Sequence, residues 1–450
     1  MKGKQQKVVT VGFVALGCPK NIVDSERMLA GIGGAGFVIS PDVDNADVVV
    51  INTCGFIAPA KEEALGAIAQ AIEQKQKGSV RKVIVAGCLS QRMGDQLASM
   101  KGIDAVVGLA ERDNIAAIIR KTLKKSRRQG GMEVYVSDVD SHVADDRGRF
   151  LITPAHWAYL RISEGCDRHC SFCTIPAIRG RFRSKPEDMV LAEAEELVAN
   201  GAVELSIIAQ DSNYYGRDLG RKNALCELLK KMEKIGGLDW IRLMYLYPAG
   251  VDDELIETIA QSERIVNYVD MPIQHINNDI LKAMRRTDRK ETTMQLIEKL
   301  RAAMPDIVLR TTVIAGFPGE TDAQFAELLD FIKWAKFDAL GCFPFFAEEG
   351  TPAAELPDQI PEEIRNERAD TIMRTQQEIA FEKIDALTGK ELTCLIDEAG
   401  PGDEATGRYY GQAPHIDSIC HIKGCKANAG DFVKVKVIAA SDYDLVCEYK

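Results

Sequence analysis

The sequence has no long apolar run. No segment reaches the roughly 18 consecutive apolar residues that a membrane-spanning helix needs. The basic start, Met1 to Lys7, leads straight into Val8-Val9-Thr10-Val11, without the apolar stretch and small-residue cleavage site of a secretory signal peptide. We therefore expect a cytoplasmic protein that has no membrane partner and is not exported.

Positive charge is also scarce relative to negative charge. The chain has 56 Lys and Arg against 67 Asp and Glu, which gives a net charge of −11. Phosphate contacts dominate nucleic-acid affinity, so this balance disfavours a polyanion as the main partner. A basic macromolecular partner fits the chain better.

Low-complexity segments are absent, and the only repeat is a loose strand-cysteine-helix unit in the first domain. With 450 residues the chain is long enough for several domains, since most domains have about 100–200 residues. From residue 8 to about 120, helical patterns alternate with β-branched runs at Val8 to Ala15, Asp47 to Asn52 and Lys82 to Ala86. This alternation predicts a parallel α/β sheet.

A charged stretch with Gly130-Gly131 separates this part from a second α/β part with six strand-helix units, which predicts a partial TIM-like barrel. The last part changes to short strands separated by turns, which is typical of a small antiparallel β-barrel. The predicted domains are residues 1–125, a linker over 126–152, a core over 153–380 and a barrel over 381–450.

Twelve cysteines stand out in a chain of this kind. Reducing conditions keep cytosolic thiols unpaired, so metal binding or catalysis explains them better than a disulfide framework. The most specific signal is the CxxxCxxC cluster Cys166, Cys170 and Cys173, directly after the first strand of the second part. Three thiolates hold three irons of a [4Fe–4S] cluster and leave the fourth iron open to chelate S-adenosylmethionine. An electron passed into the sulfonium of that molecule releases a 5′-deoxyadenosyl radical.

A zinc site is the alternative for this loop. Structural zinc takes four ligands, usually in pairs, and three cysteines at this spacing do not supply them. His169 would complete the set only by distorting the loop. We expect His169 to face solvent instead.

A second set, Cys18, Cys54 and Cys88, closely follows three predicted parallel strands. Parallel strands place their carboxyl ends at one edge of a sheet, so the three thiols are expected to converge. Scattered cysteines are more often small buried hydrophobes, but this equivalent placement favours a second [4Fe–4S] cluster whose open iron binds an exogenous sulfur species. A sulfur-presenting cluster beside a radical-generating one indicates sulfur insertion.

The loop from Gly165 to Cys173 resembles the radical-SAM superfamily, in which an aromatic residue before the third cysteine, here Phe172, touches adenine. Nearly the whole chain resembles the radical-SAM methylthiotransferases, which join a flavodoxin-like domain, a radical-SAM barrel and a C-terminal TRAM β-barrel. The resemblance implies that Gln210, Asp211 and Ser212 help hold the methionyl part of S-adenosylmethionine, and that the segment around Gly316 contacts the adenine.

Within that family the chain is similar to the RimO type, which methylthiolates the β-carbon of an aspartate in the small-subunit ribosomal protein S-twelve. The similarity rests on three motifs: Gly17-Cys18-Pro19-Lys20-Asn21 with Asp24-Ser25-Glu26, Asn52-Thr53-Cys54-Gly55-Phe56-Ile57, and Gln210-Asp211-Ser212-Asn213-Tyr214-Tyr215-Gly216. It implies two S-adenosylmethionines, one as methyl donor and one as radical source. It also implies a sulfur donor and a reductant such as flavodoxin or ferredoxin.

Two rivals remain. One is the same chemistry on tRNA adenosine, and the other is a nonenzymatic metal-binding adaptor that binds RNA. Between Ile384 and Lys450 there are seven Lys and Arg against eleven Asp and Glu, whereas RNA-binding surfaces are usually basic. An acidic barrel suits a basic ribosomal protein, whose approach it would steer.

Other residues keep more than one interpretation. The segment from Arg179 to Ser184 clamps the cluster loop, binds a substrate carboxylate or is a solvated basic turn. His275 faces the cofactor or is a hydrogen-bonded structural histidine, and Arg310 points to the cofactor or to the core. No role is assigned to the other six cysteines: Cys226, Cys342, Cys394, Cys420, Cys425 and Cys447.

Overall fold

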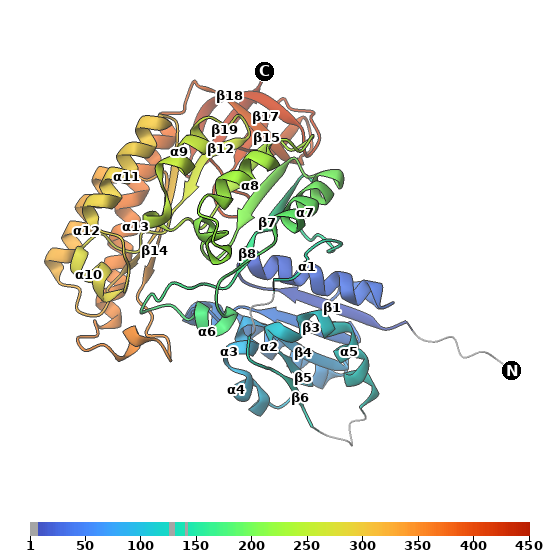
Figure 1. Ribbon diagram of the computed structural model, residues 1–450. Helices are drawn as coiled ribbons and strands as arrows, with labels where there is room; N and C mark the ends of the chain where they lie inside the picture. The colour runs from blue at the N-terminus through green and yellow to red at the C-terminus, as the bar shows by residue number, and fades with distance from the viewer. Residues whose placement is uncertain (1–7, 126–130, 140–142) are drawn as a thin grey trace. The chain divides into compact units, whose positions relative to one another are not determined.

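The computed structural model describes residues 8–125, 131–139 and 143–450 (Figure 1). Residues 1–7 of the basic N-terminus, and residues 126–130 and 140–142 of the predicted linker, lie outside the described residues. The chain forms two compact units: a first unit of Met1–Ile152, Glu164–Arg168 and Thr174–Arg183, and a second unit of Thr153–Ser163, His169–Cys173 and Ser184–Lys450. The domain boundaries expected from the sequence remain predictions.

The first unit contains a six-stranded parallel sheet in the order β2-β1-β3-β4-β5-β6. This is the strand order of a flavodoxin-like doubly wound fold, as the resemblance implied. Its elements are β1 (Thr10–Ala15), α1 (Pro19–Gly34), β2 (Val38–Ser40), β3 (Val48–Thr53), α2 (Ala58–Lys77), β4 (Lys82–Gly87), α3 (Cys88–Arg92), α4 (Gly94–Ser99), β5 (Ala105–Val107), the 3₁₀ helix η1 (Leu109–Asn114), α5 (Ile115–Lys124), β6 (Glu133–Tyr135) and α6 (Ile175–Arg179).

Strand β3 shows why this sheet forms. All six of its residues are buried, as expected for a central parallel strand covered by helices on both faces. Val48 and Val50 pack into the core on one face, with residues of α1 and α5, whereas Val49 and Ile51 pack into the core on the other face, with residues of α2. Because β1, β3 and β4 are parallel neighbours, their carboxyl ends lie at the same edge of the sheet.

The second unit contains an open, six-stranded parallel sheet in the order β14-β13-β12-β11-β10-β7, which confirms the partial TIM-like barrel. Its elements are β7 (Trp157–Arg161), α7 (Glu187–Ala199), β10 (Glu204–Ile208), η2 (Ser212–Tyr214), η3 (Arg217–Leu219), α8 (Ala224–Met232), β11 (Trp240–Leu243), η4 (Pro248–Gly250), α9 (Asp253–Ala260), β12 (Ile265–Asp270), α10 (Asn278–Ala283), α11 (Lys290–Ala303), β13 (Val308–Ala315), α12 (Asp322–Ala335), β14 (Ala339–Pro344) and η5 (Pro352–Glu355). Two short strands, β8 (Ser163–Glu164) and β9 (Arg183–Ser184), flank the segment that carries the CxxxCxxC loop.

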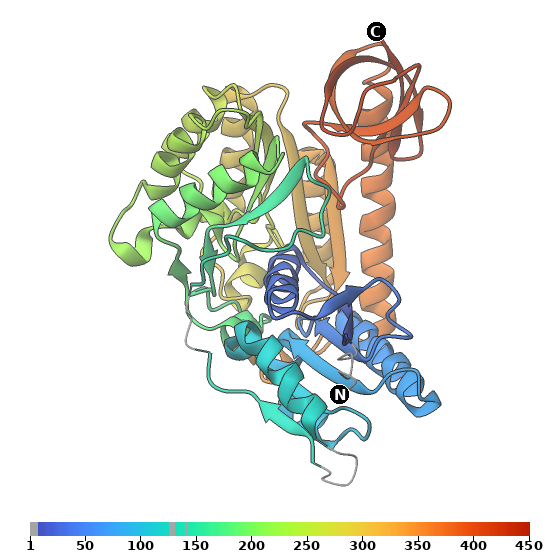
Figure 2. The same ribbon diagram turned by 90° about the vertical axis from the view of Figure 1, so that its right-hand side faces the viewer.

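Helix α13 (Glu362–Asp385) runs beside β14 and reaches the C-terminal barrel (Figure 2). That barrel is closed, with strand order β15-β16-β17-β19-β18. Its strands are β15 (Glu391–Ala399), β16 (Glu404–Tyr409), β17 (Cys420–Lys423), β18 (Phe432–Ser441) and β19 (Asp444–Tyr449).

The small C-terminal β-barrel is confirmed, and four of its five neighbouring pairs are antiparallel, whereas β17 and β19 run parallel. The reason is geometric. Neighbours in a closed ring of five strands cannot all alternate in direction, so one pair must be parallel. The β18–β19 hairpin returns the chain to that position.

A buried ionic network holds the barrel against the amino-terminal ends of the second sheet. Glu204 at the start of β10 accepts hydrogen bonds from Arg242 (2.8 Å) and from Arg408 of β16 (2.7 Å), and all three side chains are at most 2% exposed. Arg408 also binds Asp397, which lies 2.8 Å from the His156 ring. The barrel is thus fixed to the sheet by paired charges that neither part could bury alone.

Arg310 belongs to the same region. Its guanidinium binds Asp270 at 2.9 Å and Asp417 of the barrel at 3.3 Å, and Asp417 also accepts a hydrogen bond from the Tyr268 hydroxyl. Of the two interpretations of Arg310, the structure therefore supports the one in which it packs in the core. In the described part of the chain, no helix is long and apolar enough to cross a membrane.

Candidate functional site

Three cysteines of the first unit converge at the carboxyl edge of its sheet. Cys18 is the N-cap of α1, Cys54 directly follows β3, and Cys88 is the first residue of α3 after β4. The strands β1, β3 and β4 are neighbours, so the loops that follow them lie side by side. The three thiols therefore start from neighbouring loops at this edge.

Glycines make this approach possible. Gly17 has φ of 94°, and a Cβ there would lie 2.8 Å from the Cβ of Cys54 and 3.3 Å from its Sγ. A Cβ on Gly87, with φ of 95°, would lie 2.3 Å from Oδ1 of Asn52. Any other residue at these two positions would push the cysteine loops apart, because only glycine fits both the conformation and the space.

Asn21 ties two of the cysteine loops together. Its Nδ2 donates hydrogen bonds of 2.9 Å to the carbonyl oxygens of Leu16, two residues before Cys18, and of Thr53, the residue before Cys54. Its Oδ1 lies 3.5 Å from Sγ of Cys88. One asparagine on the first turn of α1 thus fixes the spacing of the whole set.

Burial opposes the ionisation of the Cys54 and Cys88 thiols. Burial raises the pKa of Cys54, although its hydrogen bond with the backbone of Phe56 acts in the other direction. Burial also raises the pKa of Cys88 to about 12, against the opposing effect of Arg179. Metal ligands are thiolates, so a bound metal centre would supply most of the stabilisation that these buried sulfurs need.

The donor set fits an iron–sulfur cluster better than a single ion. No group of three or more His, Cys, Asp or Glu side chains in the described residues is arranged to hold a metal ion. An iron–sulfur cube takes one thiolate for each iron, so its ligands need to surround a cluster rather than meet at a point. Three convergent thiols with close-packed glycines satisfy that requirement.

The CxxxCxxC loop lies between β8 and α6. Cys166 belongs to the first unit, where its N–H donates to the carbonyl of Gly180 (3.1 Å), and Cys170 and Cys173 belong to the second. Within the second unit, the Ser171 hydroxyl donates to the carbonyl of Ala283, and the Ser171 N–H donates to Met284. His169 is exposed, as expected for a loop histidine that is not a ligand.

Phe172 is partly buried against an apolar cluster of the second unit that includes Phe317 and Phe345. Phe317 directly follows Gly316, so the aromatic residue of the cysteine loop and the glycine turn after β13 share one neighbourhood. This is the placement that two residues contacting one adenine would need, and the contact itself remains a prediction.

Gln210, Asp211 and Ser212 follow the carboxyl end of β10, and Gly316 follows that of β13. These ends lie at one edge of the parallel sheet, where barrel enzymes place their sites. The Ser212 hydroxyl donates to the carbonyl of Met244, and the Gly316 N–H donates to Glu320 (3.0 Å). These two groups therefore shape the site rather than offer donors to it.

His275 is buried and acts as a structural residue. Its Nδ1 accepts the N–H of Asn277 (3.0 Å), and its Nε2 lies 3.3 Å from Glu320. Glu320 in turn accepts hydrogen bonds from Arg368 (2.8 Å) and from the Gly316 N–H. Of the two interpretations of His275, the structure favours the one in which it supports the Gly316 turn.

The segment from Arg179 to Ser184 is not a solvated basic turn throughout. Arg179 is fully buried in the first unit, whereas the Arg181 side chain is 81% exposed. Arg179 donates to Glu164, two residues before Cys166, and to Asp24 and Asn21 of α1. The pairing of Arg179 with Asp24 could not be predicted from the sequence, because the two residues lie 155 positions apart.

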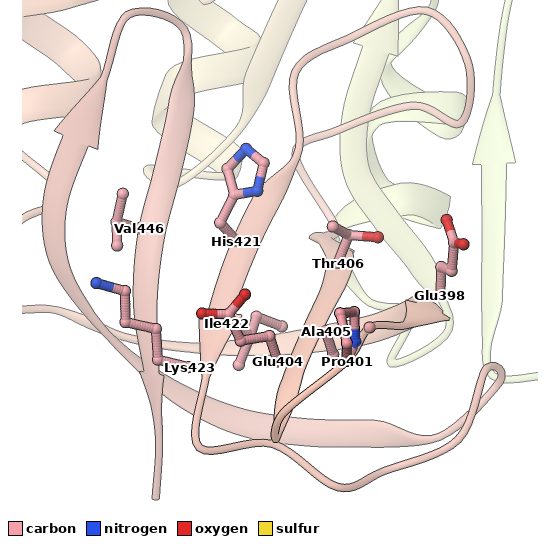
Figure 3. A pocket seen from close by; sticks show the side chains of 10 residues that line it. Glu398, Pro401, Glu404, Ala405, Thr406, His421, Ile422, Lys423 and Val446 are labelled. Atoms are coloured by element: carbon pink, nitrogen blue, oxygen red, sulfur yellow. The ribbon is translucent and has the colours of Figure 1, made fainter.

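The C-terminal barrel carries an open pocket of about 490 Å³ (Figure 3). Its wall includes Glu398 at one end, Glu404, and Lys423 and His421 on the neighbouring strand. Among the described residues, neither Glu398 nor Glu404 forms an ion pair. These carboxylates are therefore available to a cationic group outside the chain.

Family models match three parts of the chain. Residues 10–108 match a family described as uncharacterized protein family UPF0004, residues 160–332 match the radical SAM superfamily, and residues 388–449 match the TRAM domain. These ranges cover most of the first sheet, most of the second sheet and the C-terminal barrel, in that order.

Full-length relatives decide the family. A protein of Symbiobacterium thermophilum named ribosomal protein uS12 methylthiotransferase RimO is 42% identical over 98% of this chain and 91% of its own length. Proteins of the same name from Clostridioides difficile and Geobacter sulfurreducens are 41% and 42% identical, over 98% and 97% of this chain and 98% of each relative. The chain belongs to the RimO family.

Solved structures support the fold of this RimO family member. The radical S-adenosylmethionine methyltransferase TsrM from Kitasatospora setae, solved with tryptophan and an analogue of S-adenosylmethionine, gives a TM-score of 0.55 at 15% identity. The match covers 75% of this chain and 73% of TsrM. At this identity the likeness concerns the fold alone.

Most of the cysteines without an assigned role pack in cores of this RimO family member. Cys394, Cys420, Cys425 and Cys447 are buried in the apolar core of the C-terminal barrel, and Cys226 is buried in α8. This burial supports leaving them out of the metal sites.

Proposed function

We propose that this protein is a radical-SAM methylthiotransferase that modifies the β-carbon of an aspartate in ribosomal protein uS12, using two [4Fe–4S] clusters and S-adenosylmethionine. The observation that carries the proposal is the convergence of Cys18, Cys54 and Cys88 in a chain that also has the CxxxCxxC loop. Family membership adds the identity of the substrate, because the relatives are named for uS12.

Cys166, Cys170 and Cys173 would hold the first cluster. When bound, such a cluster supplies the electron that cleaves S-adenosylmethionine into methionine and a 5′-deoxyadenosyl radical. The chain's own contribution is to fix the loop: Gly180 accepts the Cys166 N–H, and Ala283 and Met284 anchor Ser171. Phe172, Gln210, Asp211, Ser212 and Gly316 would then form the walls that orient the bound S-adenosylmethionine.

Cys18, Cys54 and Cys88 would hold the auxiliary cluster, which presents sulfur when bound. Asn21 sets the spacing of these ligands, and the glycines beside them leave room for the sulfur atoms. Burial of Cys54 and Cys88 also excludes water from the place where a reactive sulfur species would stand.

The proposed reaction replaces one C–H bond of the aspartate by a C–S bond. One β C–H bond of the aspartate is broken, and its hydrogen atom passes to the 5′-deoxyadenosyl radical to give 5′-deoxyadenosine. The remaining carbon radical joins sulfur from a sulfide-level donor, and this C–S bond formation releases one electron. That electron offsets the one consumed in cleaving S-adenosylmethionine, so the cleaved S-adenosylmethionine is the net two-electron oxidant of the C–H bond. A second S-adenosylmethionine gives its methyl group to that sulfur and leaves as S-adenosylhomocysteine. We propose flavodoxin or ferredoxin as the reductant, and a cytoplasmic location because ribosomes are there.

The C-terminal barrel is proposed to bind the basic substrate protein. Two of its carboxylates are already paired within the chain: Asp397 contacts Arg408 and His156, and Asp417 contacts Arg310. The pocket carboxylates Glu398 and Glu404 are exposed and are thus better candidates for contact with a Lys or Arg of uS12.

Mass spectrometry of ribosomal proteins from cells with and without the gene tests the proposal. We expect uS12 from cells with the gene to carry one methylthio group on an aspartate, and uS12 from cells without it to lack the group. A methylthiolated tRNA adenosine that depends on the gene, with unmodified uS12, would support the tRNA rival instead.

Metal content separates the proposal from a nonenzymatic adaptor. Protein purified and reconstituted without oxygen should contain about eight irons, because the chain offers two sets of three thiolates. Stoichiometric zinc with little iron would contradict both clusters.

A further inference from the structure

Arg179 touches the ligand set of the auxiliary cluster directly. Its Nη2 lies 3.4 Å from Sγ of Cys88, and the side chain is 2% exposed. Nη2 has two hydrogens and also lies 2.9 Å from both Asn21 Oδ1 and Asp24 Oδ2, so the Cys88 sulfur shares one of these hydrogens with an oxygen. Nη1 donates to Glu164 Oε1 at 3.0 Å. A buried cation with planar, fixed donors is therefore aimed at one ligand sulfur.

The charge of Arg179 is held in a balanced buried set. Arg112 contacts the same two carboxylates, Asp24 at 3.4 Å and Glu164 at 3.7 Å, so two arginines face two acids. Arg112 differs in one respect: no contact with a cysteine sulfur is found for it among the described residues. The two arginines therefore share their anions but not the sulfur.

If Arg179 only stabilised the fold through its ion pairs with Asp24 and Glu164, it would not need to contact the sulfur of Cys88. Arginine is not deprotonated in proteins, and Arg179 pairs with the carboxylates of Glu164 and Asp24. Arg179 thus stays protonated and keeps its N–H groups. Hydrogen bonds and positive charge near cluster sulfurs stabilise the reduced, more negative cluster and raise its reduction potential.

We propose that Arg179 is a positioning residue that donates a hydrogen bond to the Cys88 ligand and raises the reduction potential of the auxiliary cluster. This inference rests on the proposed function, because it takes Cys88 as a cluster ligand. It also assigns a second task to the segment after the CxxxCxxC loop, since Arg179 joins Glu164, next to Gly165-Cys166, with Cys88.

The test uses the full-length protein with Cys166, Cys170 and Cys173 all replaced by Ala, so that only the auxiliary cluster can form. In that background we compare Arg179→Gln/Asp24→Asn with Arg112→Gln/Asp24→Asn. Each double variant keeps one buried arginine and Glu164, so the net charge is equal. Only the first loses the donor to Cys88.

Reduction is followed by electron paramagnetic resonance in an anaerobic redox titration. We expect Arg179→Gln/Asp24→Asn to lower the ratio of reduced to oxidised cluster about tenfold at a fixed potential, which is 59 mV for one electron. The matched variant, Arg112→Gln/Asp24→Asn, should change this ratio far less. Arg179→Lys keeps the positive charge but loses the planar set of guanidinium N–H donors. Its reduction potential should lie between those of the first variant and the parent.

Equal potentials in the two double variants would overturn the inference and leave Arg179 as a structural cation. If Arg179→Gln/Asp24→Asn fails to fold, Arg179→Lys decides alone: a potential identical to that of the parent would overturn the inference. If the triple-Ala background binds no iron at all, the auxiliary cluster itself is absent. The proposed function then fails, and that failure is distinct from an unshifted potential.

Discussion

At the scale of single residues, each cysteine of the CxxxCxxC loop is irreplaceable if the first cluster makes the radical. Cys166→Ala, Cys170→Ala or Cys173→Ala should reduce release of 5′-deoxyadenosine to background, because these three thiolates are the ones proposed to leave an iron open to S-adenosylmethionine. Chromatography of anaerobic reactions measures this product. Retained cleavage would mean that the radical cluster has been assigned to the wrong cysteines.

The auxiliary cysteines should behave differently. Cys18→Ala, Cys54→Ala or Cys88→Ala should abolish methylthiolated product while measurable cleavage of S-adenosylmethionine continues, since the loop that makes the radical is intact. Cys226→Ala serves as a control, because Cys226 is a buried cysteine of α8 outside both sets. Parallel loss of product and cleavage would argue that the auxiliary cysteines only maintain the fold.

The sequence predicts which cysteines belong to the two ligand sets, but not which side chains surround them in the folded protein. Cysteine spacing and strand ends are local signals, and they led to both ligand sets. Arg179, Asp24 and Glu164 are separated by up to 155 residues, so no local pattern joins them. The basic segment that contains Arg179 offered three interpretations, and burial was needed to choose among them.

At the scale of elements, the carboxylate at the start of β10 should carry much of the stability of the second unit. Burial alone would raise the pKa of Glu204, but Arg408 and Arg242 hold it below its usual range. Glu204→Gln would leave two buried arginines short of an anion, and we expect a loss of about 3–5 kcal/mol at pH 7. Urea unfolding followed by tryptophan fluorescence measures it, because Trp157 and Trp240 lie in the adjacent strands.

The same prediction has a pH dependence with a definite sign. A carboxylate with a lowered folded-state pKa stabilises the fold above the unfolded pKa of about 4.3, and this contribution is lost as the pH falls through the folded value. The difference between parent and Glu204→Gln should thus shrink in acid. Glu187→Gln is the control, because Glu187 also pairs with two cations, Arg221 and Lys231, but at a partly exposed site. Equal losses in both variants would contradict the argument.

The order of strands and helices could be predicted, because the hydrophobic periodicity and the positions of the cysteines indicate the same strand ends. Strands β13 and β19 have the bounds that the pattern indicates, Val308–Ala315 and Asp444–Tyr449. The three-residue strands β2 and β5 were missed, since three residues are too few to show a period. The parallel β17–β19 pair was missed because it depends on closure of the ring and not on any one strand.

At the scale of the whole chain, the C-terminal barrel cannot be treated as a removable module. Deleting residues 384–450 would remove Arg408 and Asp417 and leave Glu204 and Arg310 without these partners. Charge reversal is the cleaner test of substrate binding. Glu398→Lys/Glu404→Lys should weaken binding of purified uS12 at least several-fold at low salt, because both carboxylates lie in the barrel pocket.

Salt and a matched variant complete that prediction. Binding by the parent should weaken as salt rises, since exposed charges are screened over about 8 Å at physiological ionic strength. Glu367→Lys/Glu378→Lys makes the same change in net charge on exposed positions of α13, outside the pocket. Unaltered binding by the pocket variant, or equal weakening by both, would reject the pocket as the contact.

The balanced set around Arg179 also constrains how this family can diverge. Arg112 and Arg179 both contact Asp24 and Glu164 in one buried place, so the loss of any one of the four leaves a buried charge with fewer opposite charges beside it. We therefore expect substitutions at these positions to occur in pairs, one arginine together with one acid. Among relatives, replacement of Arg112 should be accompanied by replacement of Asp24 or Glu164, whereas Arg179, which also serves a sulfur, should be the last of the four to change.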